Sequence, residues 1–443
     1  MIRNVTFVAV AMLILSGSAF CQHSVAAPAA KPTAAAPIGT VTAASSPSPA
    51  KPAPSTPDAR SAAALALSGE PTFDIGTAQR IRDAALSYSD LAVRGGWPAI
   101  PADAKFALGV AGPQDDLLRA RLIVSGDLAS DQASGPFDDI LAAGVKRFQA
   151  RHGLAATGMI TPRTLAALNV PVQKRIQQLE ASLERVVNMD FGFSQRYVVV
   201  NIPAAYAEAV ENDHVVRRYR VIVGKTEKPS PTLTAEITNV NLNPTWTVPA
   251  SITKNEIAAH MRKDPTYVAR MHMELLDAHE GVLDPRAVDW SATHTPNFTV
   301  RQQSGAWNAL GAVRIDMPNS YSVYMHDTNQ KSLFSDDYRF DSHGCARVDN
   351  VRDLAAWLLK ELPKWNRQEI DQVIASSQRE DIHLPQKIPV AWIYLTGWMT
   401  RDQTVQFRND IYDQDTQLLE ATAEEEAFFD QASAHPLAGH LAR

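Results

Sequence analysis

A group of potentially reactive side chains lies between residues 324 and 347. Cys345 directly follows His343 and Gly344, and a second histidine, His326, lies upstream in the same segment. A thiol attacks only as the thiolate, and an ordinary cysteine with a pKa of about 8.5 is ionised to only a few per cent at neutral pH. Cys345 therefore needs a base, which either histidine can supply, and a nearby imidazolium would lower the pKa of its thiol.

The glycine before the cysteine meets a second requirement of acyl transfer. Gly344 lets the backbone come close to a reacting carbonyl, so that amide N–H groups can stabilise an oxyanion. A helix predicted shortly after Cys345 would add to the stabilisation of the thiolate. The segment therefore predicts acyl transfer through a thioester.

Two other interpretations of the same residues are available. Cys345 can be a small buried side chain without chemistry. Alternatively, His326, Asp327, His343 and Cys345 can bind a metal, but their spacing matches no common zinc pattern. The sequence favours a nucleophilic cysteine and predicts neither a metal nor another cofactor.

The motif around Cys345 resembles a known family. The segment SHGCAR at 342–347, preceded by HDT at 326–328, resembles the signature of the L,D-transpeptidases, the cysteine enzymes that cross-link bacterial peptidoglycan. The resemblance implies that Cys345 is the acylated nucleophile and that His326 is the general base. It also implies that the substrate and oxyanion pocket is shaped by Ser342, His343, Gly344 and Arg347.

Asp327 directly follows the implied base. In the family that the motif resembles, a backbone carbonyl orients the base, and no third side chain is needed. Asp327 is therefore not assigned to a catalytic triad, and we expect it to be a solvated or structural residue.

Composition sets broad limits on the protein. The chain has 443 residues, of which 45% are hydrophobic, so it can bury more than one core and two to three domains are expected. The net charge of −6 gives no footprint for binding nucleic acid. This balance of hydrophobic and charged residues is ordinary for a secreted globular protein.

Residues 1–27 are typical of a secretory signal peptide. Arg3 supplies the positive start, residues 5–15 form an apolar run too short to span a bilayer, and residues 24–26 offer a small-x-small cleavage site. An uncleaved anchor is the alternative. We expect the protein to be exported to the periplasm.

Cys21 lies in this signal segment, where it suggests a lipoprotein, but the bulky Phe20 before it disfavours lipidation. Cleavage removes Cys21 and leaves Cys345 as the only cysteine, so no intramolecular disulfide can form. A free thiol in an oxidising compartment is exposed to damage. The presence of this free thiol is best explained by a chemical role for Cys345.

The segment that follows is rich in Ala, Pro, Ser and Thr. Residues 28–70 are predicted to be a disordered linker, because they contain almost no large apolar side chains. Residues 71–135 are predicted to be a helical scaffold, with a helix over 77–91 that ends before the GGWP at 95–98. The phrase YSDLAVRGGWPAIP resembles the scaffold of the large Gram-negative L,D-transpeptidases.

Residues 136–171 resemble the small helical peptidoglycan-binding module through VKRFQARHGLAATGMITPRTLAALN. A helix is predicted over 138–152, and a second one starts at Thr161, the N-cap, with Pro162 in its first turn. A plain helical hairpin without a ligand is the alternative. The apolar spacing over residues 172–190 predicts a linking helix.

Residues 191–420 are expected to form a mainly β catalytic domain. The patterns V-G-x-x-x-x-P-x-P-T and N-P-T-W-T-V-P-x-S-I resemble the transpeptidase domain. A turn is predicted at 211–213. The strands predicted around it cover 196–202, 205–210, 215–223 and 237–242.

Residues 252–303 look like the helical capping insertion of larger family members. Three histidines in this insertion are expected to lie at the surface, not to bind a metal; they are His260, His272 and His279.

The remainder of the domain is predicted to return to strands at 312–317 and 321–325, which places His326 at a strand end. Asp349 or Asn350 is expected to cap a helix, and 390–398 to form a last apolar strand. Residues 421–443 are predicted to be a loose acidic tail.

Together these features predict an α+β multidomain protein: a helical scaffold, a small helical peptidoglycan-binding domain and a mainly β L,D-transpeptidase domain. By resemblance, Cys345 attacks the carbonyl at the third residue of a donor stem tetrapeptide and expels D-Ala. The acyl group then passes to the side-chain amine of diaminopimelate on another stem, forming a 3-3 cross-link. The expected partners are these stem peptides, cell-wall synthases and carbapenem-type inhibitors.

Two rival functions remain open at this point. An L,D-carboxypeptidase, or a hydrolase that releases wall-linked lipoprotein, would use the same thioester and end on water. A wall-binding protein without catalysis would use neither histidine nor thiol.

Overall fold

The computed structural model describes residues 69–291 and 297–422. All of them belong to one of the two compact units into which the chain divides, Pro54–Arg443. The predicted signal peptide, the linker up to residue 68 and the acidic tail beyond residue 422 lie outside the described residues. Within these residues, no helix has the length and apolar character needed to cross a membrane.

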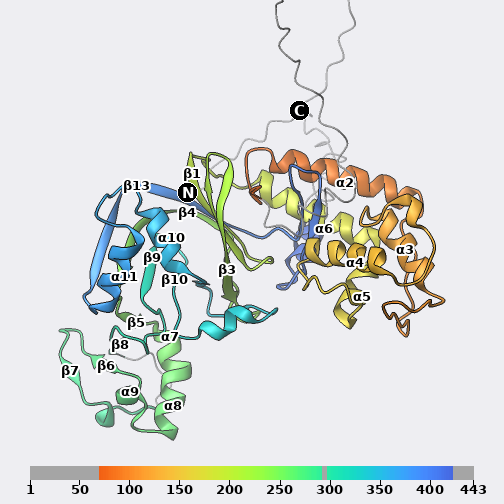
Figure 1. Cartoon of the computed structure of the whole chain (residues 1–443). Coiled ribbons are helices and arrows are strands. Elements are labelled where there is room, and N and C mark those ends of the chain that lie inside the picture. Colours follow the sequence, from red (N-terminus) through yellow and green to blue (C-terminus); the bar gives the residue numbers. More distant parts are fainter. Residues whose placement is uncertain (1–68, 292–296, 423–443) are drawn as a thin grey trace, which may run out of the picture. The chain divides into compact units, whose positions relative to one another are not determined.

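A nine-stranded sheet carries the predicted site (Figure 1). Its strand order is β11-β3-β12-β10-β9-β4-β13-β1-β2. Strand β2, the last in this order, also pairs with β3, the second. The strands are β1 (Arg196–Asn201), β2 (Tyr206–Glu211), β3 (His214–Gly224), β4 (Leu233–Leu242), β9 (Val313–Asp316), β10 (Met325–His326), β11 (Phe340–Ser342), β12 (Ala346–Val348) and β13 (Glu380–Ile393).

The first two strands follow from the alternation in the sequence. Val198 and Val200 of β1 pack in one core and Val199 in another, because successive strand residues point to opposite faces. The predicted turn between β2 and β3 is confirmed. Asn212 and Asp213 have φ of 51° and 63°, a left-handed conformation that Asn and Asp tolerate well.

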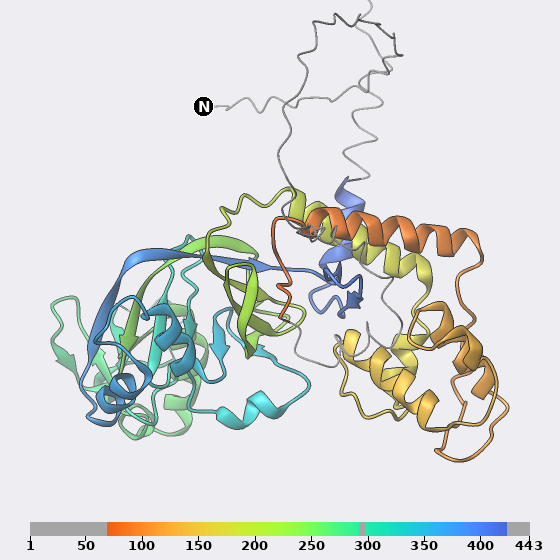
Figure 2. The same cartoon turned by 45° about the horizontal axis from the view of Figure 1, so that its top comes forward.

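Helices cover both faces of the sheet. On one face, α10 (Val351–Leu358) and α11 (Arg367–Ala375) pack against residues such as Val240. On the other face, α2 (Thr77–Val93) and α6 (Val172–Val187) pack against β1 and β13, and both views show α2 and α6 lying side by side (Figures 1 and 2). The helices predicted over 77–91 and within 172–190 are confirmed.

Three further helices share a separate core. They are α3 (Asp115–Val124), α4 (Asp139–Arg151) and α5 (Pro162–Leu168). The N-cap predicted at Thr161 is confirmed, since its side chain accepts a hydrogen bond from the Thr164 amide at 3.2 Å. Asp138 caps α4 in the same way, accepting from the Leu141 amide at 2.8 Å. Because Leu118 of α3 lies in this core, the helical unit begins before residue 136.

The insertion at 252–303 contains both helices and strands. Its helical segments are α7 (Ala250–Ile252), the π-helical turn η2 (Thr253–Ile257), α8 (Ala258–Lys263) and α9 (Tyr267–Arg270). A four-stranded sheet in the order β5-β8-β6-β7 completes it, formed by β5 (Trp246–Val248), β6 (Met273–Leu276), β7 (Val282–Leu283) and β8 (Thr299–Gln302).

The insertion also has its own hydrophobic core, which includes Met261, Val268, Leu275 and Val300. The sequence pattern indicated only helices, because strands of two to four residues are too short to show a period. His260, His272 and His279 are exposed, as predicted.

The strand predictions near the ends of the domain differ from the structure. The strand expected at 321–325 is reduced to β10, because Ser322 has a φ of 56° and the chain turns there. The strand expected at 390–398 begins earlier, at Glu380, and ends at Ile393. Two short strands follow it, β14 (Gly397–Met399) and β15 (Val405–Phe407). The fold class, a mainly β catalytic domain with helical units before it, is confirmed.

Candidate active site

Parallel strand pairing brings His326 and Cys345 together. Met325 pairs with Ala346, and His326 pairs with Arg347. Because Cys345 directly precedes β12, it lies beside Tyr324, whose carbonyl accepts a hydrogen bond from the Ala346 amide at 3.1 Å. Paired residues of neighbouring strands share a face, and so do residues two apart along an extended segment, such as Tyr324 and His326. The Cys345 thiol beside Tyr324 therefore lies on the same side of the sheet as the His326 imidazole.

The orientation of His326 is fixed by backbone. Its side chain is buried, and Nδ1 lies 2.5 Å from the carbonyl oxygen of Asp327. Since a carbonyl can only accept, Nδ1 carries the proton and Nε2 is left as the acceptor. Burial, and next the charge of Arg347, lower the pKa of His326 to about 3, while the Asp327 carbonyl acts in the opposite direction. The imidazole is therefore neutral, as a general base must be.

The Cys345 thiol is protonated at rest. Burial raises its pKa to about 11, although the Tyr324 backbone and the charges of Arg347 and Arg314 act in the opposite direction. The prediction that a nearby imidazolium lowers the thiol pKa is wrong, because burial keeps His326 neutral as well. The resting pair is a neutral thiol beside a neutral imidazole, so the proton moves during attack.

The helix after the cysteine also lies differently from the prediction. Strand β12 separates Cys345 from α10, so the helix does not begin at the thiol. Asn350 is the N-cap residue, with a φ of 51° and no side-chain hydrogen bond to the helix. Asp349 instead forms an ion pair with Arg220 at 2.9 Å. Neither predicted residue caps α10 through its side chain.

A tight turn holds the cysteine. The Ser342 hydroxyl donates to the Cys345 carbonyl at 2.5 Å and accepts from the Gly344 amide at 3.2 Å. Gly344 has a φ of 111°, which favours glycine. The Gly344 amide is thus already bonded, so it is not free to donate to an oxyanion, and Ser342 is a buried residue that shapes the turn. In the described part of the chain, the Cys345 amide donates to no protein acceptor.

A second serine supports this turn from the segment between β3 and β4. The Ser230 hydroxyl donates to the Gly344 carbonyl at 2.7 Å and accepts from the Gly224 amide at 2.9 Å. The Tyr412 hydroxyl donates to the Gly224 carbonyl at 2.5 Å and accepts from the Ser230 amide at 3.3 Å. Sequence reasoning missed both residues. The signal for Ser230 was its position between two prolines in the pattern V-G-x-x-x-x-P-x-P-T.

The other predicted pocket residues occupy distinct places. Arg347 donates to the Gln330 side chain at 3.0 Å, and its charge acts on both His326 and Cys345. His343 Nε2 lies 2.6 Å from Glu256 Oε1, on η2 of the insertion. The geometry therefore favours His326 over His343 as the base.

Asp327 is structural. Its buried carboxylate accepts from the Ala312 amide at 3.0 Å and forms an ion pair with Lys331. It therefore holds the turn before β9, and its carbonyl, not its carboxylate, orients His326. Across residues 69–291 and 297–422, no three His, Cys, Asp or Glu side chains gather into a possible metal site.

Comparison with known proteins identifies two families along the chain. Residues 195–371 match the family model described as "L,D-transpeptidase catalytic domain", and residues 112–168 match the one described as "Putative peptidoglycan binding domain". The second match includes α3, in line with the shared core of α3 to α5.

A curated protein of Haemophilus influenzae, named "Putative L,D-transpeptidase", is 32% identical over 222 residues. The match covers 50% of this chain and 45% of the relative, so the chain spans about half the length of that relative. Solved structures show similarity at low identity. An L,D-transpeptidase from Stackebrandtia nassauensis is 13% identical, with coverage of 67% of this chain and 97% of that chain and a TM-score of 0.25. An L,D-transpeptidase in complex with imipenem is 16% identical, with coverage of 45% and 59% and a TM-score of 0.22.

Proposed function

We propose that this chain, which contains an L,D-transpeptidase catalytic domain at residues 195–371, forms 3-3 peptidoglycan cross-links through a thioester on Cys345. One observation carries the proposal. His326 Nδ1 is held at 2.5 Å by the Asp327 carbonyl, which leaves Nε2 of a neutral imidazole as the acceptor on the same face of the sheet as the thiol.

The first half-reaction starts from the neutral pair. As the Cys345 sulfur bonds to the carbonyl carbon at the third residue of the donor tetrapeptide, the thiol proton passes to His326 Nε2. The imidazolium then returns this proton to the departing amine of D-Ala as the peptide bond breaks, which leaves a thioester and a neutral imidazole. The fixed tautomer of His326 serves both transfers.

The second half-reaction reverses these roles. The amine of the diaminopimelate acceptor attacks the thioester carbon, and His326 takes its proton. The sulfur leaves and receives that proton, which regenerates the resting pair. Water in place of the amine gives hydrolysis, so an L,D-carboxypeptidase differs only in its acceptor.

The oxyanion donor that fits this turn is the amide of Cys345. The Gly344 amide is bonded to Ser342, whereas the Cys345 amide donates to no acceptor among the described residues. A donor in a water-poor site stabilises the charge that develops on the substrate oxygen. The charges of Arg314 and Arg347, which favour the thiolate over the thiol, favour this oxyanion as well.

The rest of the chain suits work on the cell wall. The unit matched at residues 112–168 would hold peptidoglycan, and the signal-like residues 1–27 would send the chain to the periplasm. Cell-wall synthases that supply stem peptides are the partners we propose. A related L,D-transpeptidase is known in complex with imipenem, so carbapenems are the inhibitors we expect to acylate Cys345.

Mass spectrometry tests this function in two steps. Incubation with imipenem should add its mass to the peptide that contains Cys345, and His326→Gln should slow this acylation by about 100-fold or more. His279→Gln, an exposed histidine of the insertion, is the matched control and should react as the wild type. Absence of the adduct on Cys345 would refute the assignment of Cys345 as the nucleophile.

The second step uses purified disaccharide tetrapeptide as both donor and acceptor. Cross-linked dimer together with free D-Ala supports the transpeptidase. Tripeptide product without any dimer would show instead that water is the acceptor and that the chain is a carboxypeptidase.

A further inference from the structure

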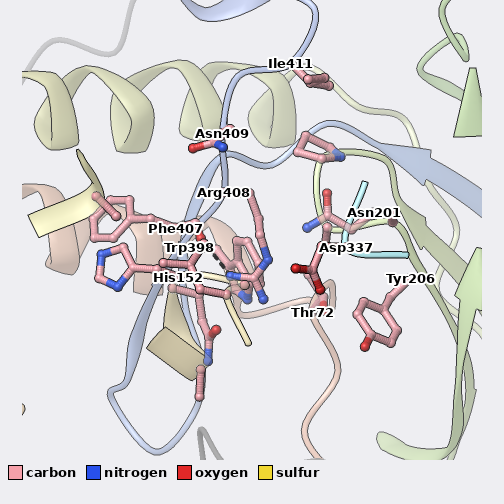
Figure 3. A pocket seen from close by; sticks show the side chains of 18 of the residues that line it. Thr72, His152, Asn201, Tyr206, Asp337, Trp398, Phe407, Arg408, Asn409 and Ile411 are labelled. Atoms are coloured by element: carbon pink, nitrogen blue, oxygen red, sulfur yellow. Dashed lines mark hydrogen bonds between the residues drawn. The ribbon is translucent and has the colours of Figure 1, made fainter. Parts of the chain in front are cut away.

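A cavity of about 750 Å³ lies away from the cysteine turn (Figure 3). Neither Cys345 nor His326 lines it. Its walls come from the ends of α4 and α5, from the segment between β1 and β2, from the residues that lead into β11, and from β14 and β15. Its volume is within the range of about 300–1,000 Å³ that is usual for ligand pockets.

The lining is rich in arginine. Five arginines line the cavity, but only three acidic residues do, namely Glu70, Glu208 and Asp337. Each of the three acids already has a partner. Glu208 pairs with Arg218 at 2.8 Å, Glu70 with Arg401 at 3.3 Å and Asp337 with Arg163 at 3.6 Å.

Three lining arginines therefore have no carboxylate partner in the described part of the chain; these are Arg175, Arg339 and Arg408. Their guanidinium groups donate mainly to carbonyl oxygens. Arg339 donates to the carbonyls of Asp336, Ala205 and Val221 at 2.9, 3.2 and 3.3 Å. Arg408 donates to those of Phe407 and Arg151 at 2.7 and 3.0 Å.

Arg175 donates to the Ala167 carbonyl at 3.1 Å and to the Gln178 side chain at 2.8 Å, while its buried Nε has no acceptor. Carbonyl oxygens satisfy donors but do not neutralise charge. Burying an uncompensated charge is costly, so these cations favour an anion beside them.

The charges of Arg339 and Arg408 are close enough to act on one another. Burial, together with the charges of Arg218 and Arg339, lowers the pKa of Arg408 to about 10, against an opposing effect of Tyr206. Figure 3 shows the Arg408 side chain reaching into the cavity, with Trp398 and Phe407 to one side and Asp337 and Tyr206 to the other. A ligand here would meet cationic groups between flat aromatic walls.

Aromatic rings contact all three of these guanidiniums, and Arg175 lies over the Phe407 ring at 4.6 Å. Arg408 lies over the Trp398 ring at 4.9 Å, and Arg339 lies over the Tyr206 ring at 5.3 Å. Cations held in this way are already positioned, so little side-chain entropy is lost when an anion binds. The geometry is that of a prepared anion site.

We propose that this cavity binds carboxylate groups of a peptidoglycan segment next to the stem that reacts at Cys345. The inference rests on the proposed function, since it takes the stem peptides as the ligand. Stem peptides carry several carboxylates, which match arginine in charge and geometry.

The position of the cavity supports this ligand. Its walls belong both to the unit matched as a peptidoglycan-binding domain and to the catalytic domain. Strand β11 begins at Phe340, which lines the cavity, and ends at Ser342, which shapes the cysteine turn. A peptidoglycan segment bound in the cavity would contact the strand that leads directly to the turn of Cys345.

Calorimetric titration of the full chain tests the proposal in a Cys345→Ala background, so that no turnover occurs. The probe is the disaccharide tetrapeptide, compared with the same compound after amidation of its carboxylates. We expect Arg339→Gln and Arg408→Gln each to weaken binding of the carboxylate probe by about tenfold. The matched control, Arg379→Gln, replaces an exposed arginine paired with Asp381 outside the cavity and should leave binding unchanged.

The two probes separate charge from shape. The amidated probe should bind more weakly, and its affinity should not respond to either substitution. Equal affinity of the carboxylate probe for the Cys345→Ala chain with and without Arg339→Gln would overturn the proposal. If Arg408→Gln does not fold, Arg339→Gln decides alone.

Pyrophosphate distinguishes a second source of anions. If it binds with a dependence on Arg339 while the carboxylate probe does not, the cavity is a phosphate site and the proposal is wrong. Acylation of the wild-type chain by imipenem is measured in parallel. Failure of this acylation would refute the proposed function. The effect of the arginine variants on probe binding tests only the anion site.

Discussion

The low pKa of His326 makes the stability of this protein depend on pH in a calculable way. The folded histidine remains neutral until the pH approaches about 3, whereas the unfolded one is protonated below its ordinary value of 6.5. Between these values the unfolded state binds more protons, so the free energy of unfolding falls as the pH falls. Near pH 5, about 1.5 units below the ordinary value, the loss at about 1.4 kcal/mol per unit is about 2 kcal/mol.

Urea unfolding of wild type and His326→Gln at about pH 8 and about pH 5 measures this loss. Glutamine keeps a donor for the Asp327 carbonyl and does not titrate, so the variant should gain about 2 kcal/mol relative to wild type on going from pH 8 to pH 5. Burial also lowers the pKa of His152, whose ring stacks on Phe148 at 3.8 Å, but this effect is common to both proteins and cancels in the difference. A difference that is the same at both pH values would refute the neutral, buried imidazole on which the mechanism depends.

Three further predictions concern the cysteine turn. Cys345→Ser should keep the wild-type unfolding curve but form no acyl-enzyme with imipenem, because a serine hydroxyl is a much weaker nucleophile beside a neutral imidazole; an ester adduct at the wild-type rate would contradict this. Ser230→Ala should cost about 1–3 kcal/mol of stability and slow acylation about tenfold, since it removes a buried hydroxyl that holds the turn, whereas the control Ser376→Ala, which removes a helix-end bond, should leave acylation unchanged. Glu256→Gln should change stability by less than about 1 kcal/mol, as the contact with His343 is partly exposed, yet speed limited proteolysis of the insertion, and unaltered cleavage would show that this contact does not hold the insertion.

The helices and the first hairpin follow from local sequence. Thr161 was recognisable as an N-cap, since a cap is completed by the backbone amide three residues along the same chain. The turn at Asn212 and Asp213 depends likewise on its own residue types. Such signals involve neighbours in the chain, so they are present before any tertiary contact forms.

The pairing of His326 with Cys345 could be inferred from the motif, but their protonation states could not. Both pKa directions are set by burial under residues distant in sequence, and burial outweighs the attraction that an imidazolium would exert on a thiolate. The bond that removes the Gly344 amide from the oxyanion site depends on how the turn closes around Ser342. The sequence alone therefore predicted which residues react, and only the tertiary structure decided their protonation states and which amide is available, because burial and hydrogen-bond partners are properties of the packed whole.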